Sequence, residues 1–200
     1  MRIAVILLAG TVSIAGCRDE RITWDAMNDR TDGESWTASR ADDTPNAETK
    51  KELAALHRAA AKFRSLKSAR AAGWSTEITG CMSDPKAGGM GYHYGNPKLI
   101  DGSVRADEPE LLLYAPEKDG GMRLTAVEYI VPLGAWTAPK PPRLFDHDFA
   151  VNSTFGVWAL HAWAWESNPS GMFAEWNPNV SCDNAQLGSE SHFILSLPRQ

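Results

Sequence analysis

The strongest constraint on how this chain folds is an apolar run within residues 155–182. Between Val157 and Glu166, residues on both sides of a period-two pattern are mainly apolar, with tryptophan and alanine prominent. A strand with two apolar faces is typical of one that is covered on both sides. The run therefore predicts a strand inside a small antiparallel β-barrel or sandwich.

His161 interrupts this apolar run, with Trp158 and Trp163 close to it in the sequence. A buried imidazole needs a hydrogen-bond partner or a metal ion, because unsatisfied ring nitrogens cost free energy in an apolar interior. Two interpretations stay open for His161: a core histidine bonded to a backbone carbonyl, and a metal ligand.

Two turn sequences follow the strand, at residues 168–171 and 176–179, and both contain Asn-Pro. Phe173 and Trp176 belong to the aromatic loop that these turns define. Such a loop can stack on a sugar or another flat ligand, but aromatic side chains beneath a long loop also pack for stability alone. Phe173 and Trp176 are candidate ligand-binding residues under the first interpretation.

The N-terminus has the form of a secretory signal peptide, with Arg2 followed by a short apolar stretch up to residue 16. The stretch is too short to span a bilayer as a permanent helix. It ends in Ile14-Ala15-Gly16-Cys17, which is typical of a bacterial lipobox. Cys17 is therefore the candidate lipidation site, although an ordinary signal peptide with an incidental cysteine is the alternative. Acylation would anchor the exported protein to the lipid bilayer, on the periplasmic side or at the cell surface.

The sequence predicts three parts. Residues 1–16 form the lipoprotein signal peptide, and residues 17–46 are a polar segment with too few apolar side chains to fold alone, which predicts a flexible tether. Residues 47–200 are predicted to form a single globular α+β domain. The chain is mildly acidic, with a net charge of −5, which argues against a nucleic-acid partner.

One N-terminal amphipathic helix is predicted to cover the sheet. It is expected to begin near Thr44-Pro45, because proline is favoured in the first turn, and to end at Gly73. Its apolar positions recur at spacings of three and four, at Leu53, Leu56, Ala60, Phe63 and Leu66.

Cys81 and Cys182 are the two cysteines that remain once Cys17 is assigned to lipid. In an exported protein such a pair is expected to form a disulfide. A catalytic thiol is the alternative, but the chain has no C-x-x-C spacing to favour it.

Glu128 lies in a predicted strand at residues 122–131, which forms a hairpin with a strand at residues 110–115. Its neighbours on one face of this strand are Ala126 and Ile130. A carboxylate among apolar neighbours needs a counter-charge, hydrogen-bond donors or a metal ion. Glu128 is therefore either part of a salt bridge or polar network, or a metal ligand.

His93 stands between Tyr92 and Tyr94 in a short predicted strand, so its side chain points away from theirs. The glycines around it are not spaced as a phosphate-binding loop and indicate a close approach of the backbone to another element. A bonded core or rim histidine and a metal ligand are both open interpretations of His93.

Four segments are long enough to be specific: GMGYHYGNP, DEPELLLYAP, RLTAVEYIVP and HAWAWESNPSGMFAEWNPNVSC. Together they resemble a family of exported bacterial proteins of uncharacterised activity, which carry secretion signals or lipoboxes. The resemblance covers roughly residues 50–183 and implies a common fold without an activity. His93, Glu128, His161 and the Asn-Pro turns match the pattern of that family.

Two histidines and a carboxylate from three separate strands can form a metal site if the strands bring them together. Such a set matches the facial triad of non-haem iron sites, or a three-ligand zinc or copper site with an open position. We therefore hypothesise a divalent transition-metal site of His93, Glu128 and His161, with metal-assisted oxidation or hydrolysis as the reaction classes it could support. The expected shell of this site is Tyr92, Tyr94, Trp163 and Trp165.

Two other functions stay open. One is a non-catalytic ligand-binding or envelope-interaction module, whose aromatic loop holds a glycan, a lipid or a small molecule. The other makes the buried polar residues a purely structural network within the core.

Overall fold

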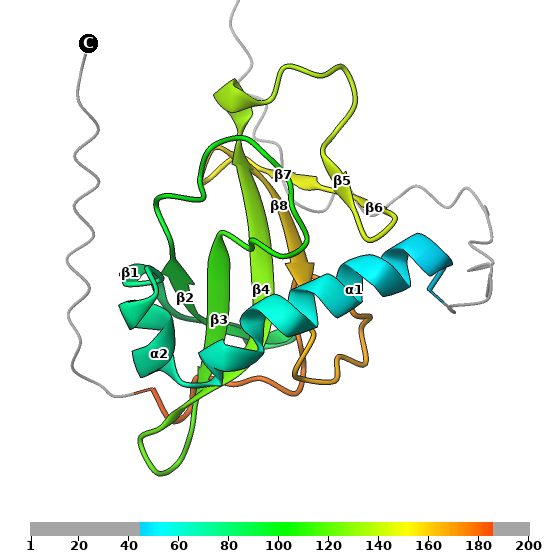
Figure 1. Cartoon of the computed structure of the whole chain (residues 1–200). Helices are drawn as coiled ribbons and strands as arrows, with labels where there is room; N and C mark the ends of the chain where they lie inside the picture. The colour runs from blue at the N-terminus through cyan, green and yellow to red at the C-terminus, as the bar shows by residue number, and fades with distance from the viewer. Residues whose placement is uncertain (1–44, 186–200) are drawn as a thin grey trace, which may run out of the picture. The chain divides into compact units, whose positions relative to one another are not determined.

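A six-stranded antiparallel sheet is the main element of residues 45–185, the part of the chain that the structure describes (Figure 1). The structure is a computed structural model. The strand order is β1-β2-β3-β4-β8-β7, so β1 and β7 form the two edges. The strands are β1 Thr76–Asp84, β2 Gly88–Gly95, β3 Leu111–Pro116, β4 Met122–Pro132, β7 Ala150–Asn152 and β8 Val157–Ala162.

The sheet curls like half a barrel and does not close. Irregularities in the β1–β2 and β3–β4 registers bend the strands, and among the described strands β1 and β7 are not paired with each other. The α+β class is confirmed. Of the expected small antiparallel barrel or sandwich, the structure shows a curled half-barrel formed by one main sheet. A separate two-stranded sheet, β5 Arg143–Leu144 with β6 His147–Asp148, lies in the Pro-rich stretch between β4 and β7.

The helical segment at residues 47–71 has three pieces instead of one continuous helix. It begins after Asn46, slightly later than the expected start at Thr44-Pro45, because the Asn46 side chain accepts a hydrogen bond from the Thr49 amide at 2.9 Å. Gly73, with φ at +120°, follows the last turn, as expected for the end of the segment. The pieces are α1 Ala47–Ala60, the 3-10 helix η2 Ala61–Arg64 and α2 Leu66–Ala71.

The sheet has apolar side chains on both faces. The face beneath α1 packs against Leu56, Ala60 and Phe63, and Tyr114 Oη donates a hydrogen bond to the Phe63 carbonyl at 2.6 Å. Alternate residues of the same strands point the other way, toward what we call the site face. The buried apolar residues of the site face are Met90, Leu111, Leu113, Ala115, Ala126, Ile130, Trp163 and Val180.

Residues 163–182, here called the covering segment, pack on the site face. Trp176 and Val180 belong to its apolar cluster, and Asn177 exchanges two backbone hydrogen bonds with Gly89 of β2, at 3.0 and 3.1 Å. Glycine is required at this approach because a Cβ on Gly89 would lie 2.7 Å from the Val180 carbonyl oxygen. The glycines of β2 thus let the backbone of the covering segment lie close to the sheet, as their density in the sequence indicated.

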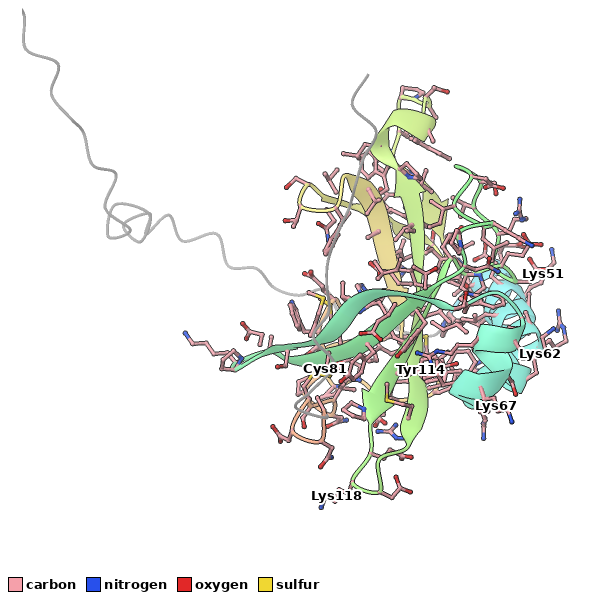
Figure 2. All side chains as sticks on the ribbon, turned by 90° about the vertical axis from the view of Figure 1, so that its left-hand side faces the viewer. Lys51, Lys62, Lys67, Cys81, Tyr114 and Lys118 are labelled. Atoms are coloured by element: carbon pink, nitrogen blue, oxygen red, sulfur yellow. A yellow bond between two sulfur atoms is a disulfide. The ribbon has the colours of Figure 1, made fainter. Side chains whose placement is uncertain are left out.

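The Cys81 and Cys182 sulfurs lie at disulfide distance, 2.00 Å apart, and join positions 101 residues apart in the sequence. Cys81 is in the edge strand β1. The pair connects an edge strand to the end of the covering segment (Figure 2).

Several sequence predictions lie outside the described residues. They are the signal peptide, the lipidation of Cys17 and nearly all of the tether. Within residues 45–185, no helix is both long and apolar enough to cross a bilayer.

Candidate metal centre

Three strands bring His93, Glu128 and His161 onto the site face. Glu128 of β4 is directly opposite His161 of β8 in the ladder. His93 of β2 faces Leu113 of β3, which in turn faces Ala126 of β4, two residues before Glu128. Cross-strand partners and residues two apart share a face of the sheet, so the three polar side chains point to the same side.

The three side chains converge in the interior. The Nε2 atom of His93 is 3.6 Å from one oxygen of Glu128, and the Nε2 atom of His161 is 3.8 Å from the other. One potential ligand atom from each residue lies within 4.8 Å of the others. The residues are 3%, 7% and 7% exposed, for His93, Glu128 and His161 respectively. The hypothesis that these residues meet is therefore confirmed.

These separations suit a metal ion better than hydrogen bonds. At 3.6 and 3.8 Å, neither imidazole is within hydrogen-bond distance of the carboxyl group. Ligand atoms that each lie about 2.1 Å from a shared ion are about 3–3.5 Å from one another, so a separation of 4.8 Å would shorten by roughly 1.3–1.8 Å on binding. Small side-chain rotations can supply that change.

The Nε2 atom of His161 has no hydrogen-bond partner. Among residues 45–185 it is the single buried side-chain nitrogen or oxygen atom in this condition. A buried polar atom without a partner costs about 1–3 kcal/mol, and native proteins seldom keep one without a reason. A ligand bound at this atom would provide that reason.

His93 is oriented by Thr79 of the neighbouring strand β1. The Thr79 hydroxyl lies 2.8 Å from His93 Nδ1, and the Gly91 carbonyl also stabilises the protonated ring. With Nδ1 bonded in this way, Nε2 is the nitrogen directed at Glu128. Metal-binding histidines commonly have this arrangement, in which the second ring nitrogen is fixed by a neighbouring group.

Burial determines the charge of the cluster. It raises the pKa of Glu128 to about 8, with further contributions from the Glu175 and Glu110 carboxylates. Burial also lowers the pKa of His93 to about 4 and that of His161 to about 3. At neutral pH and without a cation, both imidazoles are thus neutral and the Glu128 carboxyl group keeps its proton.

Glu110 is a second buried carboxyl group near the site that the sequence did not single out. Its side chain accepts a hydrogen bond from the Ile130 amide at 3.1 Å, and burial raises the pKa of Glu110 to about 8. Glu110 directly precedes β3, beyond the Leu111–Glu128 pair at which the pairing of β3 with β4 ends. Its carboxyl group therefore takes the place of a β3 partner for the Ile130 amide. This bond gives Glu110 a structural role.

Only part of the expected shell surrounds the site. The Trp163 ring stacks near His161, with ring centroids 6.4 Å apart and planes at 13°. Tyr92 and Tyr94 point to the face beneath α1 because they alternate with His93, so their expected place in the shell is corrected. Trp165 also leaves the site, because the strand ends at Ala162 and its ring packs against His57 of α1 at 5.4 Å.

Phe173 and Trp176, the two aromatic residues of the predicted ligand-binding loop, pack in different parts of the domain. Trp176 packs on the site face, whereas Phe173 stacks on Phe145 with ring centroids 5.5 Å apart. The Phe173 ring also packs against the His147 ring, with ring centroids 4.2 Å apart. Both side chains thus pack against the domain, and their binding of a glycan or other ligand stays a prediction.

Thr79 is the functional candidate that the sequence analysis missed. The β1 strand around it mixes polar and apolar residues and pairs with β2 in an irregular register, so no clear alternation marks it. One signal in the sequence could have pointed to Thr79. It lies two residues before Cys81, and the predicted Cys81–Cys182 disulfide places Cys81 beside the end of the covering segment.

No protein-family model, curated protein or solved structure matches the chain.

Proposed function

We propose that this domain binds a divalent transition metal ion, namely zinc, iron or copper, through His93, Glu128 and His161. The observation that carries the proposal is the convergence of three potential ligand atoms around the partnerless Nε2 of His161. Two imidazoles and one carboxylate are a ligand set that suits each of these metals.

Each residue has a distinct part in this proposal. Glu128 supplies the negative charge that offsets the cation, and the two histidines bind as neutral imidazoles through Nε2. Thr79 holds the ring of His93 through Nδ1, and Trp163 shields the centre from water. Three protein ligands leave a coordination position for water or a small substrate, as in metal-assisted hydrolysis or oxidation.

A purely structural polar network explains the site less well. In such a network the buried groups would satisfy one another, yet His161 Nε2 has no hydrogen-bond partner and Glu128 is beyond bonding distance of both rings. This observation favours a bound cation over a closed network.

The proposal includes an exported, lipid-anchored protein. The lipobox at Cys17, the polar tether after it and the resemblance to exported bacterial proteins support this location. Disulfides persist in oxidising compartments, so the Cys81–Cys182 pair also favours an exported protein.

Elemental analysis tests the metal proposal. The full chain is purified from metal-replete medium, and the wild type is expected to hold about one ion per chain, as one three-ligand site predicts. His161→Ala and Glu128→Gln are expected to lose it, whereas His57→Ala, an exposed histidine on α1, keeps it.

Circular dichroism of each variant separates loss of the ion from loss of the fold. A folded wild type that holds no metal after purification, and takes up none of the three ions on titration, would contradict the proposal. Equal metal content in the wild type and a folded His161→Ala variant would also contradict it.

A further inference from the structure

The helical segment at residues 47–71 carries an excess of positive charge, although the whole chain has a net charge of −5. It contains seven Lys or Arg residues and two Glu residues, a balance of 7 − 2 = +5. All seven basic side chains are exposed. They are Lys50, Lys51, Arg58, Lys62, Arg64, Lys67 and Arg70.

Much of this charge lies on one side of the helices. Lys51 and Arg58 of α1 are seven residues apart, so they fall on the side of that helix opposite the buried Leu56 and Ala60. Figure 2 shows Lys51, Lys62 and Lys67 projecting from the outer side of α1 and α2, whereas Lys118 lies at a distance, on the β3–β4 hairpin. The outer side of α1, η2 and α2 is called the basic face below.

Much of the charge of the basic face has no ion partner. Elsewhere in the domain the arginines pair with carboxylates, as Arg143 does with Asp146 and Asp148 at 2.6 Å. Within residues 45–185, the one ion pair on the helical segment joins Lys51 to Glu48. The remaining basic residues include Arg58, which lines a shallow hollow with Asp107, Arg70, which packs over the Tyr94 ring, and Lys50, Lys62, Arg64 and Lys67.

We propose that the basic face docks on the surface of a bilayer that contains anionic phospholipid. Long, flexible basic side chains on a helix are typical of surfaces that bind anionic lipid headgroups, and each Lys or Arg near such a surface adds to the attraction. Negative headgroups would supply the counter-charge that the basic face lacks. This interaction is separate from the proposed metal site, which lies on the other face of the sheet. It is also additional to the proposed acyl anchor.

The position of the basic face along the chain supports the same partner. The helical segment begins two residues after Pro45, so 29 residues, 18–46, separate it from the candidate lipidation site Cys17. A chain of that length that is anchored at one end keeps the helices close to the bilayer, which raises their effective concentration at its surface. Charge attraction and tethering would then act on the same face.

Lysine acetylation of the full chain in lipid vesicles tests the proposal. The protein is reconstituted in neutral vesicles and in vesicles with added anionic phospholipid, and acetylation of each lysine is followed by mass spectrometry. On anionic vesicles we expect acetylation of Lys51, Lys62 and Lys67 to slow on the order of fivefold. Lys118 provides the control within the same molecule and should be acetylated equally fast on neutral and on anionic vesicles. High salt should remove the slowing at Lys51, Lys62 and Lys67.

Charge-reversal variants complete the test. Lys62→Glu with Lys67→Glu should abolish the protection of Lys51, whereas Lys118→Glu, a single charge reversal on the hairpin, should preserve it. Equal acetylation on neutral and anionic vesicles, or equal protection of Lys118, would overturn the proposal. Protection by an acidic polypeptide without any by anionic vesicles would also overturn it, in favour of a protein partner.

Discussion

Glu128 is the residue whose ionisation most affects the proposed metal site. Burial raises its pKa to about 8, so the carboxyl group is protonated at neutral pH in the metal-free protein. A bound cation requires the carboxylate, and metal binding must therefore displace this proton. The histidines release none above pH 5, because burial holds the pKa of each well below its ordinary value.

The first prediction is that metal binding releases protons in a pH-dependent way. At pH 7 about one proton should leave per metal ion bound, and the number should fall toward zero as the pH rises through 8. Titration calorimetry in two buffers of different ionisation enthalpy measures this number. A value near zero at pH 7 would show that Glu128 is not the group displaced.

The second prediction concerns Thr79. Thr79→Val removes the hydroxyl that orients His93, which should weaken metal binding about 10–100-fold while the fold is retained. Metal titration of the two proteins measures the difference. Thr76→Val, an exposed change in the same strand, serves as the control and should bind like the wild type. An unchanged affinity in Thr79→Val would mean that His93 needs no orienting group.

Among the elements, β2 and the covering segment depend on each other. Gly88 and Gly89 let the backbone of residues 177–180 approach β2 so closely that no larger residue fits. An added Cβ would lie 2.2 Å from the Asn177 carbonyl oxygen at Gly88, and 2.7 Å from that of Val180 at Gly89. The glycines are thus required for packing, and no ligand need be invoked for them.

The third prediction follows from this contact. Gly89→Ala should destabilise the protein by about 1–3 kcal/mol, because the covering segment must move away from the sheet. Gly134→Ala is the matched control, since a Cβ there meets nothing within 4 Å. Urea denaturation of the metal-free proteins gives both values. Equal urea midpoints for Gly89→Ala and the wild type would show that the covering segment can move without loss of stability.

The sequence predicted the central elements well because they alternate clearly. The strands expected at residues 110–115 and 122–131 correspond to β3 Leu111–Pro116 and β4 Met122–Pro132. The helix was found in outline from its apolar spacing, but its division into three pieces was not. The edge strand β1 was missed because its residues lack a period, and pairing with β2 determines its course.

At the scale of the whole molecule, the sequence could suggest that the site residues meet but could not establish it. His93 and His161 are far apart in the sequence, and their proximity depends on the strand order β2-β3-β4-β8, which long-range pairing sets. The misplaced Tyr92 and Tyr94 are a different case. The alternation that directs His93 to the site face directs its two neighbours away from it, so the sequence already contained the correction.

The three proposed ligand residues all belong to hydrogen-bonded strands, none to a loop. A loop-borne centre can expand or contract to suit ions of different radius. Strand ladders resist such adjustment, and the cluster offers a single carboxyl group. Large cations that need six to eight oxygen ligands, such as calcium, would therefore fit the proposed site poorly, because of the rigid backbone as well as the choice of side chains.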